Sequence, residues 1–284
     1  MLRYEIVDVF TDTAFAGNPL AVVLDGEDLT RAQMQSLARE FHLSETAFPL
    51  PSVAADYRLR IFTPDTELPF AGHPSLGSAH TLARLGRIAM GNVTQECRAG
   101  LLPLEVGRGS ATLTGGAAVL GDVHEGQPLA QAVGLDADDL APVAPHTAGC
   151  GLDFCYLPVR ADAVARAVPD GRALAALAAA GNGGMVVFGW DGQRREAHVR
   201  VFGAAVGVVE DPATGSAALG LGVFLVGAGL LPVDGSTTYT VHQGAEVLRP
   251  STLRCSVTAR GGDVTAVTVS GGVVPVASGT IRRP

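Results

Sequence analysis

Residues 58–79 read RLRIFTPDTELPFAGHPSLGSA, and residues 198–217 read HVRVFGAAVGVVEDPATGSA. When Pro74 is aligned with Pro212, the tripeptide Gly-Ser-Ala coincides in the two segments and His73 falls on Asp211 (211 − 73 = 138 residues). An alternating, strand-like stretch precedes each loop, and an apolar stretch of helical length follows it. Because this offset is close to half of the 284-residue chain, the repeat predicts duplication into two similar domains.

The residues around the repeat predict a similar order of elements in each half. Thr30 and Gln33 have the spacing of a helix capping box, and apolar residues follow at helical intervals. The uncharged run 217–233 is shorter than the ~20 residues that a membrane span needs, so it predicts a buried central helix. Further elements are expected as strands at 46–50, 59–62, 185–190 and 199–202, and as a helix over 161–180 that is broken near Pro169 and Gly171.

The two repeated loops carry the candidate functional residues. Proline is favoured in the first turn of a helix, so Pro74 and Pro212 predict helix starts. His73 and Asp211 would then lie immediately before the helices, with Asp211 as an N-cap. Exposed N–H groups make a helix start a binding site for anions, including carboxylates. If the two helix starts face each other across a domain interface, they would form a site for a small molecule.

The overall composition limits the possible partners. The net charge is −8 and no basic run occurs, which argues against a nucleic-acid partner. Charged residues interrupt the N-terminal segment, so no secretory signal is expected, and we predict a cytoplasmic protein without a membrane segment. The four cysteines form no CxxC pair and are expected to be reduced and buried. They are Cys97, Cys150, Cys155 and Cys255.

Five motifs occur in order along most of the chain. They are FAGNPLAVV at 15–23, SETAF at 44–48, GHPSLGSA at 72–79, EDPATGSA at 210–217, and QG at 243–244 followed by RPS at 249–251. Together they resemble the phenazine-biosynthesis PhzF-like isomerases. In that family a threonine is common at the position that Ser75 occupies here.

The resemblance implies an α+β fold of the diaminopimelate epimerase type. Two pseudo-symmetric domains are expected, each a curled, mostly antiparallel sheet around a central helix, with the active site in the cleft between them. The first domain would cover 1–117 and the second 118–270. The C-terminal strand, 271–284, is expected to return to the first domain.

The resemblance also implies roles for individual residues. Glu45 matches the catalytic acid/base, and apolar neighbours at 46–50 are consistent with a raised carboxyl pKa. His73 and Asp211 match polar partners that orient the substrate or assist proton movement. The second half has no glutamate that corresponds to Glu45, so the site should be asymmetric. Residues expected to contact the substrate are Gly72, Ser216, Gly215, Ser75 and Asn18.

The expected activity is therefore proton transfer on a small carboxylate-bearing substrate related to trans-2,3-dihydro-3-hydroxyanthranilate. No metal and no organic cofactor are expected, and the protein should be a homodimer. The role of Glu210 is left open between a structural acid and a site residue.

Two other functions remain open at this level. One is an epimerase or racemase of another small acid on the same fold. Its two-thiol version is disfavoured because neither repeated loop contains cysteine. The other is a ligand-binding or interaction protein on this scaffold that performs no turnover. Two further patterns carry little weight: His73 and His80, two helical turns apart, lack further metal ligands, and Gly227-x-Gly229 lacks the spacing of a dinucleotide motif.

Overall fold

The computed structural model describes residues 1–176, 183–203 and 208–284. The chain divides into two compact units. Unit 1 comprises Met1–Thr114 and Ser270–Pro284, and unit 2 comprises Gly115–Val269. Strand β17 (Asp263–Ile281) belongs to both units, since it begins in unit 2 and ends in unit 1.

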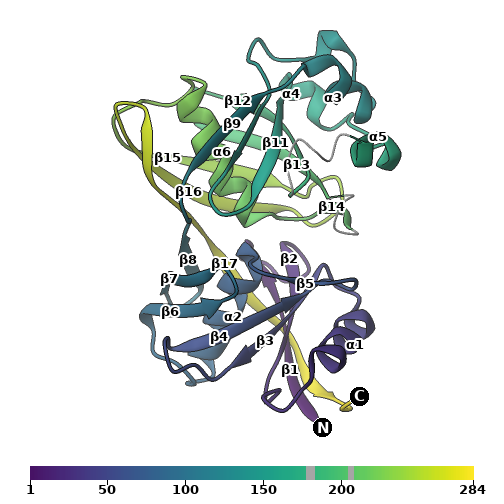
Figure 1. Ribbon diagram of the computed structural model, residues 1–284, viewed down its shortest axis with the longest axis vertical. Helices are drawn as coiled ribbons and strands as arrows, with labels where there is room; N and C mark the ends of the chain where they lie inside the picture. Colours follow the sequence, from purple (N-terminus) through teal and green to yellow (C-terminus); the bar gives the residue numbers. More distant parts are fainter. Residues whose placement is uncertain (177–182, 204–207) are drawn as a thin grey trace. The chain divides into compact units, whose positions relative to one another are not determined.

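Unit 1 is a curled sheet wrapped around helix α2 (Gly72–Arg84) (Figure 1). Strand β17 pairs with β1 from Leu2↔Ile281 to Val9↔Val273, so the last strand lies beside the first. The other elements of the unit, in chain order, are β1 (Leu2–Val9), β2 (Asn18–Val23), α1 (Arg31–Phe41), β3 (Glu45–Leu50), β4 (Tyr57–Phe62), β5 (Glu67–Leu68), β6 (Gly91–Cys97), β7 (Gly100–Val106) and β8 (Ser110–Thr114).

Unit 2 is built around helix α6 (Gly215–Gly227), which contacts β9, β10, β11 and β16. Its elements, in chain order, are β9 (Val119–Val123), α3 (Gly126–Ala132), a 3₁₀ helix (Ala137–Asp139), β10 (His146–Gly149), β11 (Asp153–Pro158), α4 (Ala161–Val164), α5 (Gly171–Ala176), β12 (Met185–Asp191), β13 (Glu196–Gly203), β14 (Val208–Asp211), β15 (Gly235–Gln243) and β16 (Ser251–Arg260).

The two units share the same strand pairing. In unit 1, β1 and β2 are antiparallel, β2 and β3 parallel, β3 and β4 antiparallel, and β4 and β6 parallel. Unit 2 repeats that order: β10 and β11 are antiparallel, β11 and β12 parallel, β12 and β13 antiparallel, and β13 and β15 parallel. Each central helix follows a short strand that folds back on the repeated strand, β5 on β4 and β14 on β13. The repeat recognised in the sequence is thus a repeat of topology.

Both central helices are almost completely enclosed. Twelve of the thirteen residues of α2 and twelve of the thirteen of α6 are buried. The uncharged run 217–233 therefore does form a buried helix, but the helix ends at Gly227 rather than at Val233. The expected helix over 161–180 is two short helices, α4 and α5, and its last residues, 177–180, lie outside the described residues.

The local signals at the first helix are confirmed. Thr30 is the N-cap of α1, and Thr30 and Gln33 form the expected capping box. All four cysteines are free and buried. Among the described residues, no helix combines the length and apolar character that crossing a membrane requires.

Glycines in α6 let two tyrosine hydroxyls reach the backbone of the helix. Tyr156 donates to the carbonyl of Ala217 at 2.7 Å, and Tyr239 donates to that of Ala218 at 2.6 Å. A Cβ on Gly220 would overlap the Tyr156 hydroxyl. The small residues of this helix are therefore required by the close approach of the surrounding sheet.

Each repeated strand carries an arginine that forms a two-bond ion pair, and the side chain is 21% exposed in Arg60 and 8% exposed in Arg200. Arg60 donates to Glu67 at 2.7 and 2.9 Å, and Arg200 donates to Glu210 at 2.9 and 2.7 Å. Each guanidinium also lies over the aromatic ring two residues further along its own strand, at 5.2 and 5.0 Å. Arg200 donates in addition to the carbonyl of Ala167 at 2.6 Å. Glu210, whose role the sequence left open, is thus the partner of a buried cation.

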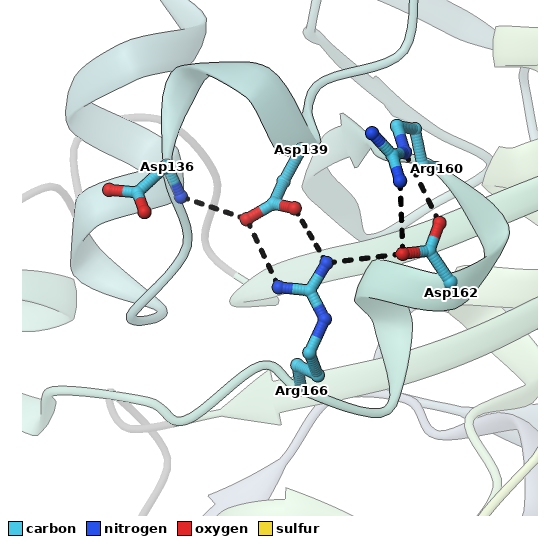
Figure 2. A network of polar contacts seen from close by, with 5 residues as sticks. All are labelled: Asp136, Asp139, Arg160, Asp162 and Arg166. Atoms are coloured by element: carbon cyan, nitrogen blue, oxygen red, sulfur yellow. Dashed lines mark hydrogen bonds and ion pairs between the residues drawn. The ribbon is translucent and has the colours of Figure 1, made fainter.

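An exposed polar network joins the 3₁₀ helix of unit 2 to α4 (Figure 2). Arg166 donates to Asp139 at 2.6 Å and to Asp162 at 3.3 Å, and Asp162 also accepts from Arg160. The hydrogen bond from Arg166 holds the pKa of the Asp139 carboxyl below its usual value. Because the side chains of Arg160, Asp162 and Arg166 are each more than half exposed, the ion pairs of Asp162 contribute little to stability.

Replacing Gly220 by alanine should destabilise the fold despite the higher helix propensity of alanine. The new Cβ would overlap the Tyr156 hydroxyl and lie 3.1 Å from the Gly149 Cα. Overpacking of this kind costs about 1–3 kcal/mol, measurable as a lower urea midpoint. Gly109→Ala is the matched control, since no atom lies within 4 Å of its Cβ position. Equal stability of the two variants would contradict the role assigned to Gly220.

Removing the Glu210 carboxylate should be strongly destabilising, because the Arg200 side chain, only 8% exposed, would keep a buried charge without its partner. Loss of one member of a buried pair costs about 3–5 kcal/mol. Chemical unfolding of Glu210→Ala beside Asp162→Ala provides the comparison. The Asp162 pair is 57% and 60% exposed, so that control should lose less than about 1 kcal/mol. A similar loss in both variants would show that burial does not decide the effect.

Candidate active site

Three residues expected to act in catalysis or substrate binding meet in unit 1. Asn18 is the first residue of β2, Glu45 is the first residue of β3, and His73 is the second residue of α2. Strands β2 and β3 are parallel, with Leu20 opposite Glu45, so both begin at the same edge of the sheet. Helix α2 packs against both strands, which brings its first turn to that edge.

The imidazole of His73 lies between two of these side chains. Its Nε2 atom is 3.4 Å from Oε2 of Glu45, and its Nδ1 atom is 3.2 Å from Nδ2 of Asn18. Ser44 donates its hydroxyl to Oδ1 of Asn18 at 3.0 Å. The side chain of His73 is 3% exposed and that of Glu45 is 14% exposed. A carboxylate with limited access to solvent thus contacts a buried imidazole.

Burial lowers the pKa of His73 to about 3. The imidazole is therefore neutral near pH 7, and its contact with Glu45 is not an ion pair. A neutral imidazole carries one N–H donor and one acceptor nitrogen. Beside the Glu45 carboxylate, it forms a pair of groups that can hold a proton and orient one another.

The start of helix α2 is fixed from within the unit. Ser75 donates to the carbonyl of Ala71 at 2.8 Å and accepts from Gln95 at 3.0 Å, and Gln95 accepts from the Tyr57 hydroxyl at 2.8 Å. Ala71, the N-cap, offers no side-chain hydrogen bond. The hydroxyl of Ser75 therefore secures the first turn, and its expected contact with substrate stays a prediction. Gly72 is the first residue of the helix.

Helix α2 corrects one expectation from sequence. Pro74 does lie in the first turn, but His73 lies within that turn instead of before it. The helix begins two residues earlier than the proline because Ala71, in an extended conformation, already serves as the N-cap.

In unit 2 the expected capping by Asp211 is wrong. Asp211 is the last residue of β14, and α6 begins at Gly215 with Thr214 as its N-cap. Pro212 therefore precedes the helix. The reason is that β14 stays paired with β13 as far as Asp211, opposite Val201.

A glutamine holds the segment between β14 and α6. Gln243 donates to the carbonyl of Asp211 at 2.7 Å and accepts from the N–H of Thr214 at 3.0 Å, while the Thr214 hydroxyl donates to the Asp211 carboxylate at 2.6 Å. Gly215 and Ser216 are the first two residues of α6, and Ser216 is buried. Sequence reasoning assigned no role to Gln243 or Ser44, although both lie in the quoted motifs.

The carboxylate of Glu45 has no counterpart in unit 2. Thr46 lies opposite Phe62, and Met185 lies opposite Phe202, so the residue that corresponds to Glu45 is Gly184. His73 and Asp211, which align in the sequence repeat, lie in different kinds of element. His73 lies in helix α2, and Asp211 is the last residue of strand β14. The expected asymmetry of acid groups is therefore present in the described residues.

Metal and thiol chemistry find little support in the described ranges 1–176, 183–203 and 208–284. No group of three or more His, Cys, Asp or Glu side chains there is placed to hold a metal ion. His80 contacts the carbonyl of Arg108 at 3.3 Å. Burial raises the pKa of the Cys150, Cys155 and Cys255 thiols to about 12 each, which disfavours the thiolates that a two-thiol racemase requires.

Comparison with known proteins gives a consistent result. The family model described as phenazine biosynthesis-like protein matches residues 7–279. A trans-2,3-dihydro-3-hydroxyanthranilate isomerase of Pseudomonas fluorescens is 36% identical over 295 residues, covering 99% of each chain. A Bacillus anthracis phenazine biosynthesis protein of the PhzF family superposes with a TM-score of 0.90 at 26% identity, and a predicted epimerase of Pseudomonas aeruginosa with 0.83 at 34%; each alignment covers 99% of both chains.

These similarities confirm the expected fold class and the expected enzyme class. The match extends over nearly the whole chain. The chain therefore belongs to the family of phenazine biosynthesis-like proteins and is an isomerase.

Proposed function

We propose that this protein is a cofactor-independent isomerase that moves a proton between carbon atoms of a small carboxylate-bearing substrate. Trans-2,3-dihydro-3-hydroxyanthranilate, the substrate named for the Pseudomonas fluorescens relative, is the first compound to test. The observation that carries this proposal is the contact of the Glu45 carboxylate with the buried, neutral imidazole of His73 at 3.4 Å.

Glu45 acts as the general base and then as the general acid. Its carboxylate takes a proton from carbon, the electron pair of the broken C–H bond shifts the neighbouring double bond, and the protonated carboxyl returns the proton to another carbon. The overall change is an isomerisation in which neither oxidant nor reductant takes part. Limited solvent access at Glu45 favours return of the same proton over exchange with water.

The helix starts suit the substrate carboxylate. Neither Ala71 nor Thr214, the N-caps of α2 and α6, makes a side-chain hydrogen bond to its helix. The first N–H groups of such a helix attract an anion. We assign this binding to Gly72, Gly215 and Ser216.

Asp211 has a separate role in the proposal. The Thr214 hydroxyl donates to its carboxylate, and Gln243 holds its backbone carbonyl. This fixed carboxylate would accept a hydrogen bond from a substrate hydroxyl or amino group. Asp211→Asn should therefore raise KM more than it lowers kcat.

An epimerase of another small acid is the second candidate, supported by the similarity to the predicted Pseudomonas aeruginosa epimerase. It would use the same Glu45 and differ in the carbon that receives the proton. Homodimer formation and a cytoplasmic location stay predictions, and light scattering on the purified protein measures the first.

Replacing Glu45 by glutamine should reduce turnover by about 10²–10⁴-fold, the usual contribution of a positioned acid or base. Proton NMR of the candidate substrate in D₂O, with wild type beside Glu45→Gln, measures conversion directly. Glu105→Gln is the matched control, since Glu105 is an exposed strand residue, and it should retain full activity.

Each outcome of this experiment separates the candidates. Conversion by both wild type and Glu45→Gln would exclude Glu45 as the base. Solvent deuterium incorporation at a stereocentre without a double-bond shift would favour the epimerase. Ligand binding without turnover in either protein, for this and other small unsaturated acids, would favour a binding protein.

The low pKa of His73 predicts a stability that falls in mild acid. The unfolded imidazole binds a proton near pH 6.5, whereas the folded one does so only near pH 3. Stability from this group is therefore present above about pH 6.5 and is lost as the pH falls toward 3, by up to ~1.4 kcal/mol per pH unit. Urea unfolding at pH 7, 6 and 5 should give a steeper loss in wild type than in His73→Asn. Parallel pH dependences would show that the imidazole is not held neutral.

A further inference from the structure

The side chain of Asn18 is completely buried, and its expected contact with substrate stays a prediction. Its Nδ2 atom lies 3.2 Å from Nδ1 of His73, and its Oδ1 atom accepts from the Ser44 hydroxyl at 3.0 Å. Asn18 therefore links the residue before Glu45 to the imidazole that contacts Glu45.

We propose that Asn18, oriented by Ser44, is a positioning residue that holds His73 in the tautomer with its proton on Nε2. An amide N–H that donates to Nδ1 requires a lone pair there, so the single proton of the neutral ring must lie on Nε2. This inference deepens the proposed function, and its physical content can be measured without substrate.

The other face of the imidazole supports the same assignment. Nε2 is buried and its nearest acidic atom is Oε2 of Glu45 at 3.4 Å. An N–H at Nε2 points a donor at the carboxylate, whereas the opposite tautomer would point a lone pair at it. The Nε2–H tautomer thus presents a lone pair to the Asn18 amide and a donor to the Glu45 carboxylate. The contact is long for a hydrogen bond, and such contacts often tighten when substrate binds.

The consequence for catalysis follows from the geometry. With the proton on Nε2, His73 stabilises the Glu45 carboxylate before proton abstraction and does not compete with the substrate as a proton acceptor. With the proton on Nδ1, the lone pair of Nε2 would face the Glu45 carboxylate and repel it. Asn18 and Ser44 therefore act through His73 and need not touch the substrate.

Asn18→Asp replaces the amide donor that faces Nδ1 of His73 by an acceptor, and the side chain keeps almost the same shape. A carboxylate at position 18 accepts a hydrogen bond and cannot donate one, so Nδ1 of His73 should become protonated. Ser44→Ala should leave the amide free to turn and give a mixture of tautomers. Asn92→Asp is the matched control for the substitution itself, because Asn92 is an exposed residue of β6.

The experiment is long-range ¹H–¹⁵N NMR of the histidine side chains in the full-length, ¹⁵N-labelled protein near pH 7, with His73 assigned by the signals absent from His73→Gln. Wild type and Asn92→Asp should show a protonated Nε2 and an unprotonated Nδ1, and Asn18→Asp should show a protonated Nδ1. A protonated Nδ1 in wild type, or an unprotonated Nδ1 in Asn18→Asp, would overturn the proposal. If the buried carboxylate prevents folding of Asn18→Asp, the proposal is tested by the spectra of wild type and Asn18→Ala. Asn18→Ala is then expected to show a mixture of both tautomers.

Activity provides an independent second readout. If isomerisation is established, Asn18→Asp should lower kcat by at least about tenfold, as expected when a proton-handling pair is disturbed, and leave KM nearly unchanged. A wild-type Nε2–H tautomer without any isomerase activity would uphold the positioning and reject the proposed function. Isomerase activity with the opposite tautomer would uphold the proposed function and reject the positioning role of Asn18.

Discussion

The enclosure of a short helix inside a curled sheet is the constraint on which the rest of each unit depends. With twelve of thirteen residues buried, α2 cannot turn a polar face to water, so the polar side chains of its first turn are held by contacts with the surrounding strands. Ser75 accepts a hydrogen bond from Gln95, and the His73 ring contacts Asn18 and Glu45. The candidate active site is thus one end of the core, where buried polar groups meet the edge at which β2 and β3 begin.

Duplication gave the two units the same topology but different chemistry. Both keep an Arg–Glu pair beside an aromatic ring on the repeated strand, which indicates that this feature belongs to the scaffold. Glu45 and His73 belong to unit 1, and in unit 2 the corresponding strand position is Gly184. The candidate acid/base pair and the segment that Gln243 holds at Asp211 therefore come from different copies of one framework.

The environment of His73 shows how burial sets its chemical role. Desolvation lowers its pKa far below the ordinary range in spite of the nearby carboxylate. A neutral imidazole has two inequivalent nitrogens, and its neighbours decide which of them bears the proton. In the proposed arrangement, Asn18 acts on the Glu45 carboxylate through the His73 ring.

The sequence by itself determined the duplication, the buried central helices, the capping box at Thr30 and the identity of His73 and Asp211 as candidates. Glu45 became a candidate only through the family resemblance. Hydrophobic periodicity and turn chemistry are local properties, so a repeated pattern and its motifs can be recognised without coordinates. The family resemblance added the fold class, because five motifs in order restrict the chain to one scaffold.

Only the tertiary structure decided what those residues contact. Asp211 was expected to cap α6, but the pairing of β14 with β13 and the hydrogen bonds of Gln243 from a distant strand keep Pro212 outside the helix. Glu210 was ambiguous until its bonds to the buried Arg200 were seen. Asn18 lies 55 residues from His73 in the chain, and no local pattern records such a contact. Strand register and the burial of side chains from distant segments are set by the whole core, and they decide which of the candidate residues contact one another.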